Sequence, residues 1–253
     1  MDTISQNVVV VTAAVIGSLL FITGLNAIWP AEKRRNYNEL IGWQVTILGT
    51  TYAVILGFML YTVWTTYGEA DLNVDREANA VADIYRLAQG LPEPQRAHLQ
   101  ALARLYAEAV INRDWPQMAN REEPKQADAI HSEMWKTIMS TRPVSQTEQI
   151  AEDHEISELR SLAQHRLTRL SQNATRLPNV LWCVLLAGAS LTIISACTFG
   201  VQNGKLQAVQ VLGLSLLLSL SLVAIADIHR PFQGLVHVRN YAFQRVLQSM
   251  QSN

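Results

Sequence analysis

Four long apolar runs, separated by polar stretches, dominate this chain of 253 residues. The runs are Val8–Trp29, Leu40–Tyr67, Asn179–Gly200 and Leu206–Ala226, and none carries a charged residue or a histidine in its interior. A helix needs about 20 apolar residues to cross a hydrocarbon layer of ~30 Å. Each run is long enough to do so, and the pattern therefore predicts an integral membrane protein with four transmembrane helices.

The polar residues between the two pairs of runs are predicted to fold outside the membrane. They show helical spacing of apolar positions and no strand-like alternation. We therefore predict an all-α fold, with four transmembrane helices and a helical extramembrane domain inserted between spans 2 and 3. The predicted parts are transmembrane helices 1 and 2 (residues 8–67), the extramembrane domain (68–178), transmembrane helices 3 and 4 (179–226) and a polar C-terminal tail (227–253).

The second apolar run is longer than one membrane span requires. A helix from Gly42 to Tyr67 would reach about 39 Å, and no strong helix breaker follows before Gln89-Gly90-Leu91-Pro92. We predict one helix from about Leu40 to Gln89. In its polar part, apolar residues recur every three or four positions and predict a narrow seam for helix packing: Val74, Ala78, Val81, Tyr85 and Ala88.

Three further helices are predicted in the polar segment. They begin near Pro94, Pro124 and Gln146, and they end near Asp114-Trp115-Pro116, at Met139 and at Leu177. The last of them carries an apolar stripe, which we expect to be buried: Ile156, Leu159, Ala163, Leu167, Leu170, Ala174 and Leu177.

Composition excludes several classes of function. Residues 68–178 contain 17 acidic and 13 basic residues, which argues against a nucleic-acid partner because that needs a basic surface. The two cysteines, Cys183 and Cys197, both lie in the third apolar run, so the polar domain has no disulfide or zinc framework. Asp153-His154-Glu155 has the composition of a metal site, but consecutive helical residues point in different directions, and we predict a solvated surface.

No catalytic motif is visible, and we expect no enzyme activity, no catalytic residue, no cofactor and no metal. The second apolar run carries neutral polar residues instead. Thr51, Ile55, Phe58 and Thr62 share one helix face, which is a candidate pore lining with an apolar constriction. The alternative is that the threonines only bond to their own helix carbonyls. Gly42, Gly49 and Gly57 lie on another side and are predicted to allow close helix packing.

Charged residues follow the second run and precede the third. Glu69, Asp71, Asp75 and Glu77 would form an acidic ring in a symmetric oligomer. Arg166, Arg169 and Arg176 lie at matching depth, and the two sets would pair in the other interpretation. Ion selectivity therefore stays open.

Several short motifs resemble those of the bacterial bestrophin-like family, and the resemblance extends from about Val8 to Gly234. They are Tyr52-Ala-Val-Ile-Leu-Gly-Phe58 with Trp64, Asp75–Ala88, Gly90-Leu-Pro92, Asp114-Trp-Pro116, Arg176-Leu-Pro178, Leu181-Trp182 and Arg230-Pro-Phe-Gln-Gly234. Bestrophins are pentameric ion channels whose second span lines the pore. The resemblance therefore implies a homo-oligomeric ion channel. A non-conducting membrane scaffold or sensor is the alternative, and a membrane enzyme is less favoured than either.

Two features depart from what the resemblance implies. Bestrophins carry an acidic run after Pro-Phe-Gly that can bind calcium, whereas here Gln233-Gly-Leu-Val-His237 follows without acids. The resemblance also implies a cytosolic polar domain, whereas Lys33-Arg34-Arg35 in the first loop favours the opposite orientation. We expect a multi-pass protein of the cell inner membrane, with lipid, identical copies and small ions as partners. The side of residues 68–178 stays open, and the resemblance favours the cytoplasm.

Overall fold

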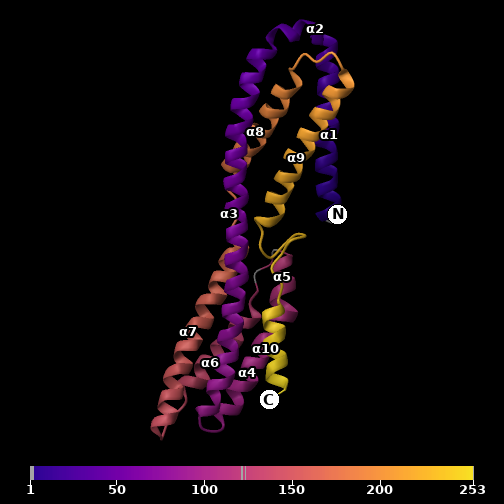
Figure 1. Ribbon diagram of the computed structural model, residues 1–253. Helices are drawn as coiled ribbons and strands as arrows, with labels where there is room; N and C mark the ends of the chain where they lie inside the picture. Colours follow the sequence, from indigo (N-terminus) through magenta and orange to yellow (C-terminus); the bar gives the residue numbers. More distant parts are fainter. Residues whose placement is uncertain (1–2, 121, 123, 253) are drawn as a thin grey trace. The chain divides into compact units, whose positions relative to one another are not determined.

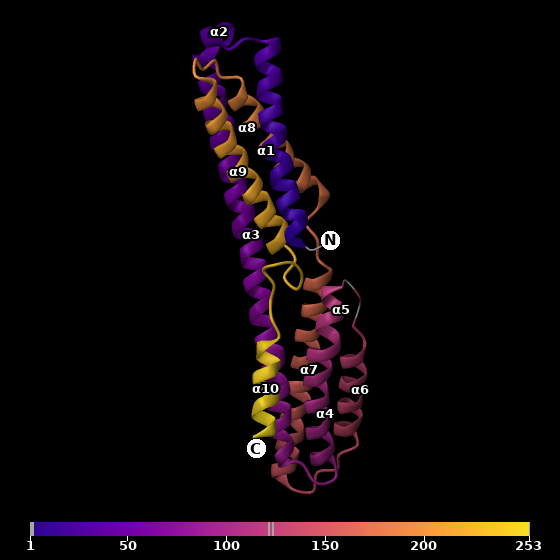
Figure 2. The ribbon, with the colours of Figure 1, turned by 90° about the vertical axis from the view of Figure 1, so that its right-hand side faces the viewer.

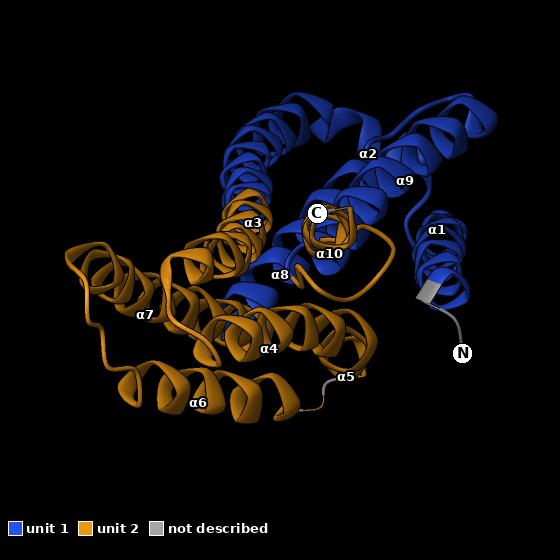
Figure 3. Cartoon of the chain, turned by 90° about the horizontal axis from the view of Figure 1, so that it is seen from below, with its two compact units in different colours: residues 1–65, 176–229 blue, residues 66–175, 230–253 orange. Residues whose placement is uncertain are grey.

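The computed structural model describes residues 3–120, 122 and 124–252, and it divides them into two compact units (Figure 3). Unit 1 comprises residues up to 65 and residues 176–229, and unit 2 comprises residues 66–175 and 230 onwards. The longest helix, α3 (Asn38–Leu87), contributes to both units. It was predicted as one helix from about Leu40 to Gln89, and that prediction is confirmed.

Unit 1 holds the helices that are apolar and long enough to cross a membrane. Within the described residues there are four, as predicted: α1 (Thr3–Ile28), the first part of α3, α8 (Asn179–Cys197) and α9 (Gly204–Ile228). Helix α9 runs beside α1 and α8 (Figures 1 and 2). Polar side chains connect α9 to α1, since the Ser215 hydroxyl donates to Ser18 Oγ over 2.8 Å.

Hydrogen bonds connect the two loops of unit 1. The first contains α2 (Ala31–Arg34) and η1 (Arg35–Tyr37), and the second follows α8. Buried Arg34 donates to the carbonyl of Cys197 over 2.6 Å and also bonds to the Asn26 side chain. The Asn38 amide exchanges hydrogen bonds of 3.0 and 2.8 Å with the backbone of Gly200. Arg34 was named with Lys33 and Arg35 as a positive charge of the first loop. Its side chain is instead buried, and it joins the first loop to the second by hydrogen bonds.

Unit 2 is a bundle of helices that includes the second part of α3, with α6 packed against α4 and α7. Its other elements are η2 (Ala88–Gly90), α4 (Gln95–Ala109), the π-helical turn η3 (Val110–Asp114), α5 (Trp115–Ala119), α6 (Gln126–Met139), α7 (Gln146–Ala174) and α10 (Tyr241–Gln251). Figure 2 shows α4, α6, α7 and α10 running alongside the end of α3.

Local sequence sets several of these boundaries. Helix α7 begins with a capping box, in which Ser145 accepts from the Glu148 amide and the Glu148 carboxylate accepts from the Ser145 amide. The helix predicted to end near Asp114-Trp115-Pro116 instead continues through η3 into α5. Pro116 is accommodated because it lies in the first turn of α5, directly after the π-helical turn, where the regular i→i−4 hydrogen-bond pattern is interrupted.

The core of unit 2 confirms one predicted packing face and corrects another. All five residues of the seam on α3, from Val74 to Ala88, are buried. On α7, by contrast, Leu167 is 62% exposed, while Arg166 and Arg169 are buried. The predicted apolar stripe is confirmed at Leu159, which is buried, and at Ile156 and Leu170, which pack against the core. It was wrong at Leu167, because the buried face of this part of α7 carries Arg166 and Arg169, whose partners lie inside the unit.

Candidate pore-lining helix and its surroundings

The first part of α3 buries one face in unit 1. Tyr52, Leu56 and Val63 are buried there, and they pack with Leu185 of α8 and Leu218 of α9. Offsets of four and seven residues place the three side chains on one side of the helix. Much of the remaining circumference of this part of α3 is exposed in the single chain.

A close contact with α8 fixes the rotation of α3 about its axis. The Tyr52 hydroxyl donates to the carbonyl of Leu185 over 2.9 Å. The Tyr52 ring lies so near the backbone of Gly188 that a Cβ there would be 2.3 Å from the ring. Only glycine fits at this position, and the tyrosine side of α3 is thereby held against α8.

The residues predicted to line a pore lie away from this buried face. Thr51, Phe58 and Thr62 are exposed, with Phe58 at 69%, whereas Ile55 is half-buried beside the α3–α8–α9 cluster. The Thr62 hydroxyl donates to the carbonyl of Phe58 over 2.8 Å, as the alternative interpretation of the threonines predicts. Such a bond keeps the hydroxyl on the helix surface, so the face presents uncharged polar groups around one large aromatic ring.

The predicted helix-packing glycines do not share one environment. A Cβ at Gly42 would be 3.9 Å from the Phe199 ring, an ordinary contact. At Gly49 and Gly57, no described atom lies within 4 Å of such a Cβ. The close packing predicted for these two positions is therefore not found within one chain, and it stays a prediction for contact between copies.

The predicted acidic ring is wrong for Glu77, which is fully buried in unit 2. Arg169 donates to both oxygens of its carboxylate, with Nε–Oε2 at 2.7 Å and Nη2–Oε1 at 2.9 Å. The alternative pairing of the acidic and basic sets is thus the correct one for this pair. Arg166 also finds a partner, the Asp128 carboxylate at 2.9 Å.

Further side chains surround Arg169, and Met118 Sδ accepts from its Nη1 over 3.3 Å. Its Nη2 also donates to Asp114 Oδ2 over 3.1 Å, the Tyr106 hydroxyl donates to Glu77 over 2.8 Å, and the guanidinium lies 5.6 Å from the Trp115 ring centroid. Burial raises the pKa of Asp114, and the charge of Arg169 opposes this. Although burial alone would lower the pKa of Arg169, the Glu77 carboxylate raises it. Asp114-Trp-Pro116 was visible as a motif, but its partner Arg169, 55 positions away, was not.

Glu155 is a third fully buried acid of unit 2, after Glu77 and Asp114, whose burial the sequence did not predict. Asp153 and His154 are exposed as predicted, whereas Glu155 is fully buried, and neither of its carboxylate oxygens has a hydrogen-bond partner within the described part of the chain. Burial and the neighbouring charge of Glu158 raise the pKa of Glu155 to about 9. This side chain is therefore protonated and neutral at neutral pH.

The motif Arg230-Pro-Phe-Gln-Gly234 anchors the C-terminal segment in unit 2. The Phe232 ring meets the Trp115 ring edge-on at 5.8 Å, and the Gln233 amide donates to the carbonyl of Met118 over 3.2 Å. Gly234 has a φ of 89°, which favours glycine. No three His, Cys, Asp or Glu side chains among the described residues are grouped to hold a metal ion.

Comparisons with known proteins agree with this architecture. The sequence profile of the Bestrophin-like domain matches residues 12–243. Crystal structures of a bacterial bestrophin homologue from Klebsiella pneumoniae have a similar fold. One mutant form has a TM-score of 0.73 at 13% identity, covering 97% of this chain and 99% of that one. Another structure has a TM-score of 0.68 at 15% identity, covering 94% and 97%. No curated protein matches the sequence significantly.

Proposed function

The chain belongs to the bestrophin-like family, and from this premise we propose that it is a homo-oligomeric ion channel with α3 at the pore axis. The observation that carries the proposal is the position of Thr51, Phe58 and Thr62. They lie exposed on α3, on a side roughly 100° around the helix from the one that Tyr52 presents to Gly188. In a ring of copies, this face would line a conduit.

The lining we propose works without charge. Uncharged hydroxyls at Thr51 and Thr62 would flank an apolar ring formed by Phe58, with Ile55 at its edge. A narrow apolar ring excludes water, and therefore ions, until it widens or is wetted. The buried pair of Glu77 and Arg169 takes no part in conduction in this proposal, since neither side chain reaches a surface.

The arrangement of copies follows the same premise. We propose five copies around one axis, with Gly49 and Gly57 facing a neighbouring copy because the single chain leaves both positions open. We further propose a multi-pass location in the cell inner membrane with unit 2 on the cytoplasmic side. The transmembrane parts would be residues 8–67 and 179–226, the extramembrane domain residues 68–178, and the C-terminal segment residues 227–253. Small ions are the proposed cargo, and we propose no enzyme activity.

A non-conducting scaffold or sensor is the second candidate. It is favoured by the absence of Asp, Glu, Lys, Arg and His from the apolar part of α3, because conduits for ions often place charged rings along their path. In this case the exposed face of α3 would contact lipid, and unit 2 would bind the partner or signal that the scaffold or sensor serves.

Reconstitution separates the two candidates. The molar mass of the purified protein is first measured in detergent by light scattering coupled to size-exclusion chromatography. The protein is then inserted into vesicles loaded with an ion-sensitive dye. A ring-sized oligomer that dissipates an imposed ion gradient is the expected result. A stable monomer, or an intact oligomer that passes neither small anions nor cations, would overturn the channel proposal and favour the scaffold.

A further inference from the structure

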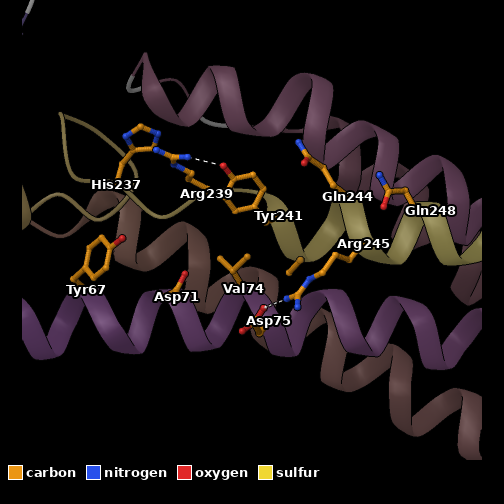
Figure 4. A pocket seen from close by; sticks show the side chains of 11 residues that line it. Tyr67, Asp71, Val74, Asp75, His237, Arg239, Tyr241, Gln244, Arg245 and Gln248 are labelled. Atoms are coloured by element: carbon orange, nitrogen blue, oxygen red, sulfur yellow. Dashed lines mark hydrogen bonds and ion pairs between the residues drawn. The ribbon is translucent and has the colours of Figure 1, made fainter.

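A groove in unit 2 runs between α3 and the segment that leads into α10. It measures about 630 Å³, which is within the range of small-molecule sites. One wall is the α3 face of Tyr67, Asp71 and Asp75, and the other carries Arg239 and Tyr241 (Figure 4). The buried side chain of Val74 lies at its base.

Each wall offers one charge to a ligand. Arg245 is paired with Asp75 at 3.2 Å, so these two neutralise each other. No described residue forms a hydrogen bond or ion pair with the Asp71 carboxylate, which is exposed. On the opposite wall, Arg239 donates to the Tyr241 hydroxyl over 2.5 Å and lies 5.5 Å from the ring centroid. The tyrosine orients the guanidinium while most of its N–H donors stay available.

The groove begins where the apolar run of α3 ends. Tyr67 is the last residue of that run, and tyrosine is a common residue at the membrane interface. Asp71 and Asp75 follow one and two turns later on the same continuous helix, so the acidic wall extends about 12 Å from Tyr67. The headgroup layer of a bilayer is about 5–8 Å thick on each side. With Tyr67 at the edge of the hydrocarbon layer, Asp71 lies about 6 Å beyond it, within the headgroup layer, and Asp75 lies about 12 Å beyond it, outside that layer.

From these three observations we propose that the groove binds the headgroup of a zwitterionic phospholipid with a primary ammonium, as in phosphatidylethanolamine. The ammonium donates to Asp71, and the phosphate accepts from Arg239, whose planar fork suits two phosphate oxygens. The inference requires insertion into a membrane but not conduction, so a protein that passes no ions can still pass its test.

The chemistry of the acidic wall selects among headgroups. A choline headgroup has no N–H and cannot donate to Asp71, and its recognition relies on aromatic cages instead. A glycerol headgroup has no cation for Asp71 and leaves that carboxylate facing the phosphate. Of these three headgroups, only ethanolamine satisfies both walls, since it brings donors to the carboxylate and an anion to the guanidinium.

Native mass spectrometry tests this binding directly. Full-length protein is equilibrated with equal amounts of phosphatidylethanolamine, phosphatidylcholine and phosphatidylglycerol in mixed micelles. Retention of the ethanolamine lipid above the other two is expected. Asp71→Asn and Arg239→Gln should each weaken it at least about tenfold, as expected for the loss of one charge-assisted hydrogen bond. Asp153→Asn and Arg160→Gln change exposed charges on α7, outside the groove, and should leave retention unchanged.

Three outcomes would overturn the proposal. The first is equal retention of all three lipids by the wild-type protein. The second is preferential retention that survives both groove variants. The third distinguishes the source of the ligand: if free phosphoethanolamine raises the melting temperature while the lipid is not retained, the ligand comes from solution rather than from the membrane.

Discussion

Arg169 and Glu77 form a two-point ion pair, fully buried in unit 2, between α7 and α3. It joins residues 92 positions apart in the sequence. Nη2 of the same guanidinium also reaches Asp114 in the π-helical turn, so one cation serves two buried carboxylates. A buried pair of this kind specifies one arrangement of the helices, because any slip would leave charges without partners.

Removing the cation should therefore be costly. Arg169→Met leaves Glu77 and Asp114 buried without compensation and should lower the free energy of unfolding by about 3–5 kcal/mol. The double variant Arg169→Met with Glu77→Gln should lose less free energy of unfolding than the single variant, since it leaves fewer buried charges without a partner. Thermal unfolding in detergent measures both. Arg160→Met, at an exposed site on the same helix, should change stability by no more than about 0.5 kcal/mol. Equal melting of the Arg169 and Arg160 variants would contradict this account.

Glu155 should make unit 2 less stable as the pH rises. The folded state keeps its proton up to a pKa of about 9, whereas the ordinary value is 4.5. Between these values the unfolded chain releases the proton and the folded chain does not, so stability falls by up to about 1.4 kcal/mol per pH unit.

Glu155→Gln removes this dependence. The variant should melt higher than wild type at about pH 8 and close to wild type at about pH 3.5, which is below the ordinary pKa of 4.5, so that both states of the glutamate are largely protonated. Asp153→Asn, two residues away and exposed, is the matched control and should follow the wild-type curve. If the melting temperatures of wild type and Glu155→Gln change by the same amount between these two pH values, then Glu155 is not the group whose protonation makes stability depend on pH.

The sequence was informative where burial follows apolarity and misleading where it does not. Four spans, one long α3 and the seam from Val74 to Ala88 could be predicted because hydrophobic spacing alone determines them. The buried face of α7 could not, because it contains Glu155, Arg166 and Arg169, which a hydrophobic pattern assigns to solvent. The two arginines are buried with partners far away in the sequence, which no local spacing reveals, and Glu155 is buried without a hydrogen-bond partner among the described residues.

The candidate pore-lining face was likewise predicted only in part. Offsets of three and four residues placed Thr51, Phe58 and Thr62 on one face, and the structure leaves that face exposed. What periodicity could not supply was the rotation of α3, which the contact between Tyr52 and Gly188 fixes. A glycine that receives a tyrosine ring looks, in sequence, like any other glycine of a membrane span.

The glycines of unit 1 should therefore differ in what their substitution breaks. Gly188→Leu clashes with Tyr52 inside the chain and should prevent folding, measured as loss of monodisperse protein in detergent. Gly57→Leu meets nothing within 4 Å in its own chain, so the protein should fold yet fail to assemble. Gly49→Leu should behave like Gly57→Leu. Light scattering reports the oligomer mass, and wild-type assembly of both variants would show that these glycines face lipid.

Membrane orientation can be measured by labelling cysteines placed at two exposed asparagine positions. In a background without Cys183 and Cys197, a cysteine at Asn36 lies in the first loop of unit 1, and one at Asn120 lies in unit 2. If unit 2 is cytoplasmic, an impermeant thiol reagent added to intact cells should label position 36 and not position 120. Permeabilised cells should label both, as a control for accessibility. The reverse pattern would favour the orientation predicted by Lys33 and Arg35.

The proposed constriction should respond to one residue more than to its neighbour. Phe58 is 69% exposed while Ile55 is half-buried, so Phe58→Ser should wet an apolar ring and raise conductance in a lipid bilayer more than Ile55→Ser does. Val54 is exposed on another side of α3, and Val54→Ser is the matched control, expected to conduct like wild type. Unchanged currents in both the Phe58 and Ile55 variants, with intact oligomers, would remove this face of α3 from the pore. An increase in Val54→Ser alone would instead place the pore on that side of the helix.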